Sequence, residues 1–206
     1  MQTIFLHGLG QTADSWDNVL ARLDASVSPV CPSLFPLLAG KKASYQNLYA
    51  AVSQLCNARE GKISLCGLSL GAVLALQYAI EHPQKVEKLV LIAGQCKSPR
   101  VMLAIQNLLF HLMPEKNFQG VGLSKRDFMA FMKSMAPLDM TAQIGTLSMP
   151  VLLLHGDADK ANAKAARTMA QLIPKSQLMT IHNAGHEVNR DNPGGLAEVL
   201  NAFLTA

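Results

Sequence analysis

The chain carries few charges and no concentrated charge of either sign. Only 16% of its 206 residues are Asp, Glu, Lys or Arg, whereas 50% are hydrophobic. Disordered and fibrous chains have the opposite balance, so the sequence predicts a globular protein with a sizeable core. The 18 basic and 14 acidic residues leave a net charge of +4, and the basic residues form no run longer than Lys41-Lys42. We therefore expect no nucleic-acid partner, because so mild an excess cannot neutralise many phosphates.

The sequence also lacks the cysteine patterns of metal and redox sites. Cys31, Cys56, Cys66 and Cys96 are well separated and form neither a C-x-x-C pair nor a zinc-ligand spacing with histidine. No metal and no cofactor are expected. The chain starts without the positive residues and cleavage site of a signal peptide, and its apolar stretches are far shorter than the ~20 residues that span a bilayer. We expect reduced thiols in a cytoplasmic protein with no membrane span.

Short apolar runs alternate with longer segments of helical periodicity along most of the chain. This rhythm predicts an α/β fold in one domain, residues 1–206, with a mostly parallel six-stranded sheet flanked by helices. Several of the runs are continuously apolar, as buried parallel strands are. The expected strands are residues 3–7, 27–31, 62–66, 88–92, 150–155 and 177–181, and the expected helices are residues 15–23, 44–56, 72–82, 161–172 and 196–204.

One segment interrupts the alternation, and we predict that it is a helical cap inserted between two strands. Residues 98–149 contain no convincing strand but two helical stretches, residues 101–112 and 125–135. Seven of the ten methionines fall in this segment. They suit an adaptable apolar surface, but they could equally pack the cap onto the body of the protein.

The strongest functional signal is the G-x-S-x-G motif Gly67-Leu68-Ser69-Leu70-Gly71. It follows a predicted strand and opens a predicted helix, which is the setting of a nucleophile elbow. So tight a turn forces a strained backbone at Ser69 and demands glycines on either side of it. The turn also places Ser69 at the positive end of the helix, where a developing oxyanion is stabilised. We therefore predict that Ser69 is a catalytic nucleophile.

A serine hydroxyl needs a base, and the base needs a carboxylate. His186 lies in the loop after the last strand, on the same edge of the sheet as Ser69, and His182 at the end of that strand is the alternative. Asp159 follows the preceding strand and is far enough from its end to reach the loop of His186. Asp157 is the alternative, although it could form an Asx-turn instead. His7 and His155, which end two strands, are expected to hydrogen-bond neighbouring loops.

A second glycine-rich turn supplies a candidate oxyanion hole. The backbone N–H groups of Leu70 and of Leu9, within His7-Gly8-Leu9-Gly10, are the expected donors. The stretch from Gly8 to Ala13 also satisfies the loose dinucleotide pattern G-x-G-x-x-A. However, the second strand ends without an acidic residue for a ribose hydroxyl, so we set the dinucleotide interpretation aside.

With these residues in place, the chain resembles the α/β-hydrolase family over nearly its full length. The likeness rests on His7-Gly8-Leu9-Gly10, the elbow at Ser69, Asp159 after its strand, and Gly185-His186 before the closing helix. It is similar to small capped esterases and thioesterases and to the branch that includes the menaquinone-biosynthesis synthase. The first predicted strand is the one before the glycine turn, so we expect a sheet without the antiparallel strands that usually open it in this family. Pro32-Ser33-Leu34-Phe35-Pro36 replaces the glycine-rich loop of many relatives.

These features favour a serine hydrolase that cleaves small carboxylic esters or thioesters through an acyl-enzyme. One alternative is a family member that uses the same triad for C–C cleavage or lyase chemistry. Another is a binding protein of low turnover on the same scaffold. The sequence names neither the acyl group nor the leaving group, and it does not give the oligomeric state.

Overall fold

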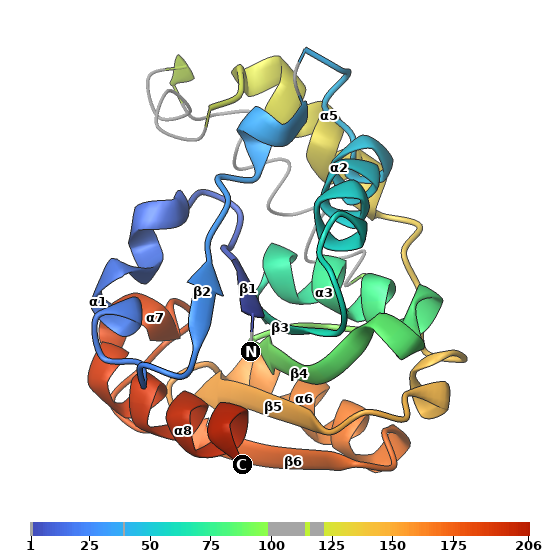
Figure 1. Ribbon diagram of the computed structural model, residues 1–206. Coiled ribbons are helices and arrows are strands. Elements are labelled where there is room, and N and C mark those ends of the chain that lie inside the picture. Colours follow the sequence, from blue (N-terminus) through green and yellow to red (C-terminus); the bar gives the residue numbers. More distant parts are fainter. Residues whose placement is uncertain (1, 39, 99–113, 116–121) are drawn as a thin grey trace.

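The computed structural model describes residues 2–38, 40–98, 114–115 and 122–206, and its centre is a six-stranded sheet (Figure 1). The strand order is β2-β1-β3-β4-β5-β6, and every pairing between neighbours is parallel. The six predicted strands are confirmed, with ends that differ from the expected ones by at most two residues. The strands are β1 Gln2–Leu6, β2 Ser28–Val30, β3 Ile63–Leu68, β4 Val86–Ile92, β5 Val151–Gly156 and β6 Ser176–Ile181.

Helices cover both faces of the sheet. Along β5, Val151 and Leu153 belong to one apolar cluster, whereas Leu152 and Leu154 belong to another on the opposite face. The first cluster includes α2, α3 and α6, and the second includes α1, α7 and α8 (Figure 1). Burial on both faces explains the continuous apolar runs in the sequence. The helices are α1 Asp17–Leu20, α2 Tyr45–Asn57, α3 Leu70–Glu81, α6 Lys160–Leu172, α7 Val188–Asp191 and α8 Pro193–Thr205.

The predicted helix over residues 15–23 differs from the observed structure. The chain forms a 3-10 turn, η1 Ala13–Trp16, and then only one α-helical turn, α1. Arg22 and Leu23 continue with backbone bonds to the residues three positions earlier, which is the tighter 3-10 pattern. Trp16 is fully buried edge-on against Phe5 of β1, so packing of this ring governs the local winding. The other four predicted helices of the body are confirmed as α2, α3, α6 and α8, the last beginning three residues early.

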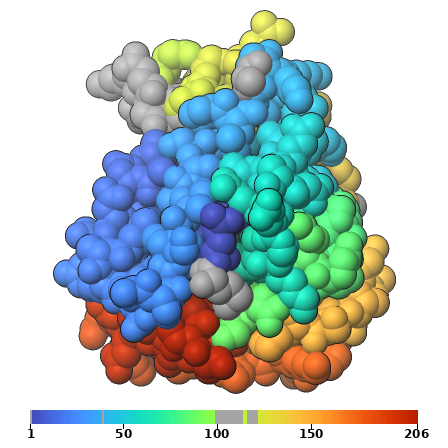
Figure 2. Space-filling model, viewed as in Figure 1, coloured from blue at the N-terminus to red at the C-terminus, as the bar shows by residue number. Residues whose placement is uncertain are grey.

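The segment between β4 and β5 contributes helix α5 Lys125–Met135, which matches the predicted range, and the 3-10 turn η5 Ile144–Thr146. Phe131 of α5 packs edge-on against Phe35 of η2 Phe35–Leu38, the turn after β2. Three further side chains of α5, Phe128, Met129 and Met132, form a cluster with Leu9, which follows β1. Helix α5 therefore lies over the carboxyl ends of β1 and β2 (Figure 1), and Figure 2 shows it in yellow above residues 31–57.

The five described methionines of this segment are buried, so they pack the segment onto the body. They are Met129, Met132, Met135, Met140 and Met149. The predicted helix over residues 101–112 lies outside the described residues. A single inserted cap over residues 98–149, and one domain over the whole chain, therefore stay predictions. In the part of the chain that the structure describes, no helix combines the length and hydropathy needed to cross a membrane.

Candidate active site

Ser69 lies on a strained turn between β3 and α3. Its φ is +54° and its ψ is −110°, a backbone conformation that residues other than glycine rarely adopt. Its amide donates to Ile92 O of β4 at 2.9 Å, and its carbonyl accepts from Val73 N at 3.1 Å. A Cβ on Gly67 would come within 2.2 Å of Gly71 O, and a Cβ on Gly71 within 2.0 Å of Leu6 O. The elbow thus requires both glycines, as its motif predicts.

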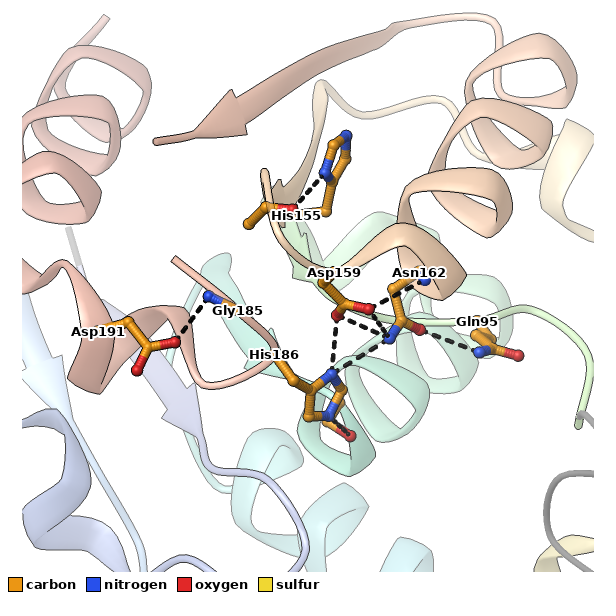
Figure 3. A network of polar contacts seen from close by, with 9 residues as sticks. Gln95, His155, Asp159, Asn162, Gly185, His186 and Asp191 are labelled. Atoms are coloured by element: carbon orange, nitrogen blue, oxygen red, sulfur yellow. Dashed lines mark hydrogen bonds and ion pairs between the residues drawn. The ribbon is translucent and has the colours of Figure 1, made fainter. Parts of the chain in front are cut away.

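His186 reaches Ser69 from the loop between β6 and α7. Its Nε2 lies 3.0 Å from Ser69 Oγ, and its Nδ1 lies 2.9 Å from Asp159 Oδ2 (Figure 3). Gly156, at the end of β5, fits closely under this loop, because a Cβ there would come within 2.2 Å of Ala184 O. The Gly185 amide, next in the chain to His186, donates to Asp191 Oδ2 at 2.7 Å. The structure therefore brings the three predicted residues Ser69, His186 and Asp159 into one hydrogen-bonded chain.

Asp159 is also the N-cap of α6, since its Oδ1 accepts from the backbone amide of Asn162 at 3.2 Å. Its side chain is only 8% exposed, whereas that of His186 is 48% exposed. Burial by itself raises the pKa of the Asp159 carboxyl. Hydrogen bonds from His186 and from the side chain and backbone of Asn162 outweigh the burial and lower this pKa below its usual value. Asp159 is therefore an ionised acceptor whose side chain is largely buried.

The two alternatives, Asp157 and His182, contact each other, and Asp157 also binds the loop of His186. Asp157 accepts the backbone amides of Asn183 and Ala184 at 3.0 and 3.1 Å, and these two bonds lower the pKa of its carboxyl. It thereby holds the loop of His186 instead of forming a turn of its own. His182 has a side chain 82% exposed, with Nδ1 3.5 Å from Asp157 Oδ2.

Two amide side chains that the sequence analysis missed complete the network around Asp159. The Asn162 amide nitrogen donates to Asp159 Oδ1 at 3.0 Å and to Oδ2 at 2.8 Å. Gln95, in the segment after β4, donates through Nε2 to Asn162 Oδ1 at 2.9 Å (Figure 3). One sequence signal could have pointed to Asn162. It lies three residues after Asp159, and the side chain of an N-cap residue accepts a hydrogen bond from the backbone amide at that position. No sequence pattern points to Gln95.

The glycine turn after β1 lies directly beside the elbow. A Cβ on Gly8 would lie 2.9 Å from Leu68 Cδ2 and 3.6 Å from Ser69 Cβ. The Gly8 amide donates to Gln11 Oε1 at 3.2 Å, which leaves the Leu9 amide as the next candidate donor of this turn. The Leu70 amide opens α3 and therefore has no acceptor within its own helix. Both predicted oxyanion donors are next to Ser69 in space or in sequence.

Of the two strand-end histidines, His7 binds a neighbouring loop, as expected, whereas His155 binds the end of its own strand and the adjacent strand β6. His7 donates from Nδ1 to Gly8 O at 2.9 Å and accepts the Leu34 amide at Nε2 at 3.0 Å, which fixes a neutral ring. Burial lowers the pKa of His7. His155 bonds Gly156 O at 2.9 Å, and its Nε2 lies 3.3 Å from Thr180 Oγ1. Within the described residues, no three His, Cys, Asp or Glu side chains gather closely enough to hold a metal ion.

The chain is similar to known proteins over most of its length. A family model described as the alpha/beta hydrolase family matches residues 3–199. The chain is 23% identical over 220 residues to a Nitrosomonas europaea protein named pimeloyl-[acyl-carrier protein] methyl ester esterase, covering 89% of this chain and 87% of that protein. A hydrolase structure from Pseudomonas aeruginosa PA01 superposes with a TM-score of 0.85 at 18% identity, covering 100% of this chain and 90% of the other. MenH from S. aureus gives 0.81 at 16%, covering 100% and 93%. Since the family model spans nearly the whole chain and the parallel sheet superposes on these structures, the chain belongs to the alpha/beta hydrolase family.

Proposed function

We propose that this protein is a serine hydrolase that cleaves small carboxylic esters or thioesters through an acyl-enzyme. Ser69 is the nucleophile, His186 the general base and Asp159 the carboxylate that orients the base. The observation that carries the proposal is the chain of contacts Ser69 Oγ to His186 Nε2 at 3.0 Å and His186 Nδ1 to Asp159 Oδ2 at 2.9 Å, on a strained elbow. The fold family and the esterase names of its relatives support the same reaction class.

The first half-reaction forms the acyl-enzyme. His186 donates an Nδ1–H hydrogen bond to the Asp159 carboxylate and keeps that proton, so its unprotonated Nε2 accepts the hydroxyl proton as Ser69 Oγ attacks the acyl carbon. The carbonyl oxygen becomes an oxyanion, which the Leu9 and Leu70 amides and the positive end of α3 stabilise. The protonated Nε2 then gives its proton to the departing alcohol or thiol. The ionised state of Asp159 stabilises the imidazolium throughout this step.

The second half-reaction frees the enzyme. Water takes the place of the leaving group, loses a proton to His186 Nε2 and attacks the acyl carbon, and Ser69 recovers that proton as the acid departs. No step needs a metal or an organic cofactor. The four cysteines are free thiols, which supports a reducing compartment such as the cytoplasm.

Pre-steady-state hydrolysis of p-nitrophenyl butyrate tests the proposal. We expect a burst of one nitrophenolate per enzyme, followed by slower turnover, because nitrophenolate is a good leaving group and hydrolysis of the acyl-enzyme is then the slower step. The Ser69→Ala variant should lose roughly 10⁶-fold in kcat while its circular dichroism spectrum stays unchanged. A fluorophosphonate probe should label wild type at Ser69 only.

The outcomes also separate the alternatives. Labelling elsewhere, or full activity of Ser69→Ala, would remove Ser69 from the role of nucleophile. Labelling without any burst or ester turnover would favour C–C cleavage or lyase chemistry, or a binding protein of low turnover. A panel of acyl chain lengths, as methyl esters and as coenzyme A thioesters, then identifies the acyl and leaving groups.

A further inference from the structure

We infer that Asn162 is a positioning residue for the reaction. Its amide holds the Asp159 carboxylate toward His186 and stabilises the negative charge of that carboxylate. This inference rests on the proposed triad and adds a residue that acts through Asp159, without contact with the substrate. The relay Gln95 to Asn162 to Asp159 is drawn in Figure 3 and reaches His186 at Nδ1, whereas Ser69 contacts Nε2.

The side chain of Asn162 is buried and donates hydrogen bonds to Asp159. Its amide nitrogen reaches both oxygens of Asp159, at 3.0 and 2.8 Å, and its residue is only 6% exposed. The Oδ2 atom that accepts from His186 Nδ1 is the same atom that lies 2.8 Å from the Asn162 nitrogen. With both oxygens engaged, the carboxylate cannot rotate away from His186 without losing hydrogen bonds in a site that water scarcely reaches.

The orientation of the Asn162 amide follows from chemistry. An ionised carboxylate only accepts hydrogen bonds, so the NH₂ group of Asn162 faces Asp159 and its oxygen faces Gln95. Gln95 donates from Nε2 to that oxygen at 2.9 Å and thereby fixes the amide from its other end. The chain turns between β4 and Gln95, where Ala93, directly after β4, has a φ of +49°. Side chains from the three segments that follow β4, β5 and β6 thus meet at Asn162.

The Asn162 amide also affects how tightly a proton is held by the pair of Asp159 and His186. Its nitrogen lies 3.2 Å from His186 Nδ1, but a protonated Nδ1 and an NH₂ group are both donors, so the Nδ1–H hydrogen bond is directed to Asp159. Donors on a carboxylate spread its negative charge, and the pKa of Asp159 is lowered despite burial. Removal of the Asn162 donor should therefore make the coupled pair more basic. The acid limb of the pH profile, which reports this pair, should then move to higher pH.

The test compares Asn162→Val with Asn162→Thr, two side chains of equal shape of which only threonine can donate to Asp159. Both keep the backbone amide that Asp159 caps, so helix α6 retains its N-cap. The probes are p-nitrophenyl butyrate, for kcat and KM from pH 5 to 9, and a fluorophosphonate, for the rate of labelling at Ser69. Asn162→Val should lower kcat roughly 10- to 100-fold with KM nearly unchanged, and should raise the acid limb by about 0.5 to 1 pH unit. Asn162→Thr should recover most of both effects.

Two controls keep the inference separate from the proposed function and from folding. If wild type neither hydrolyses the ester nor labels at Ser69, the triad proposal fails, and Asn162 is not what failed. If wild type does both, an acid limb in Asn162→Val that coincides with wild type overturns the inference, whatever the loss of rate. Equal losses in the two variants, with equal melting temperatures and an unmoved limb, would assign Asn162 a purely structural role. Gln95→Leu, at a half-buried position, should shift the limb in the same direction by less.

Discussion

At the scale of single residues, the two carboxylates in the loop after β5 have different partners and different roles. Asp157 binds the two backbone amides of the loop that carries His186, whereas Asp159 binds the His186 ring itself. Asp157 has a side chain 39% exposed, and Asp159 has one 8% exposed. A hydrogen bond to a charged group is worth more where solvent is excluded, so the buried carboxylate is suited to catalysis and the exposed one to holding the loop.

This division predicts opposite outcomes for conservative substitutions. Asp159→Asn presents an amide where His186 Nδ1–H needs an acceptor and favours the wrong tautomer, so kcat should fall by roughly 10³- to 10⁴-fold. His186→Ala should be at least as severe. Asp157→Asn keeps one acceptor oxygen for the loop, and His182→Ala removes an exposed ring, so both should stay near the wild-type rate. Hydrolysis of p-nitrophenyl butyrate by the four purified variants measures this.

Asp157 should matter for stability instead of rate. Because its pKa is lowered in the folded protein, it stabilises the fold above the unfolded value of ~3.9 and loses this effect as pH falls through the folded value. Wild type should therefore melt at a higher temperature than Asp157→Asn at pH 7, and the difference should shrink as pH falls below ~3.9 and vanish once pH is below the lowered folded value. A collapse of kcat in Asp157→Asn, with Asp159→Asn unaffected, would exchange the roles of the two.

The residues that the sequence predicts are those fixed by local rules. Gly67 and Gly71 are required because a Cβ at either would collide with backbone, and such a turn leaves a readable motif around Ser69. Asn162 and Gln95 are 67 positions apart and meet only because β4 and β5 are neighbours in the sheet. No local pattern encodes that meeting. The choice between Asp157 and Asp159 likewise depends on which loop oxygen faces the ring.

At the scale of elements, the two loops that flank Ser69 are joined by a buried pair of amides. Gln11, after β1, and Asn189 of α7 are 2% and 0% exposed. Gln11 Nε2 donates to Asn189 Oδ1 at 3.2 Å, and Asn189 Nδ2 donates to Gln11 Oε1 at 3.3 Å and to Ser15 O at 3.0 Å. The same Gln11 oxygen accepts the Gly8 amide. The turn that holds Leu9 is thus tied to the helix that follows His186.

A double-mutant cycle should detect this link. Gln11→Met leaves Asn189 Oδ1, and Asn189→Leu leaves Gln11 Nε2, buried without the bond that joins them, at a cost of about 1–3 kcal/mol in the free energy of unfolding. The double variant leaves neither amide behind, so its loss should be smaller than the sum of the two single losses by about 0.5–3 kcal/mol. Urea denaturation of the four proteins measures this coupling. Strictly additive losses would mean that the pair does not join the two elements.

The elements that the sequence predicts well are those with long periodic patterns. Helices α2, α3, α6 and α8 span 12 or 13 residues each and carry enough turns to show an apolar stripe. The sequence did not predict α7, which has four residues, or the 3-10 turn η2, because one turn of helix produces no stripe. The tight winding near Trp16 was also missed, since it follows from burial of one ring against β1.

At the scale of the whole molecule, the net charge is concentrated between β4 and β5. Residues 97–150 carry six basic and three acidic side chains, an excess of three out of the total +4. Lys97 is paired with Asp139 at 2.8 Å. Helix α5 carries Lys125, Arg126 and Lys133 against Asp127, and the same helix packs on Leu9 beside the proposed oxyanion hole. A positive α5 near the site would attract anionic substrates by long-range electrostatics.

Steering of this kind predicts a specific dependence on salt. The kcat/KM of a carboxylate-bearing ester should fall as salt rises, whereas that of a neutral ester with the same acyl chain should stay constant, because the screening length shortens to ~10 Å at 0.1 M. The double variant Lys125→Gln/Arg126→Gln should lower kcat/KM for the anionic ester alone. Arg22→Gln/Lys175→Gln is the matched control, since it removes the same charge from two exposed positions. These positions precede β2 and β6 and therefore lie toward the amino ends of the strands, away from Ser69 at the carboxyl ends. If both esters respond equally to salt, or if both double variants behave alike, the excess charge does not steer substrates. An excess of three charges is then ordinary variation of a solvated surface.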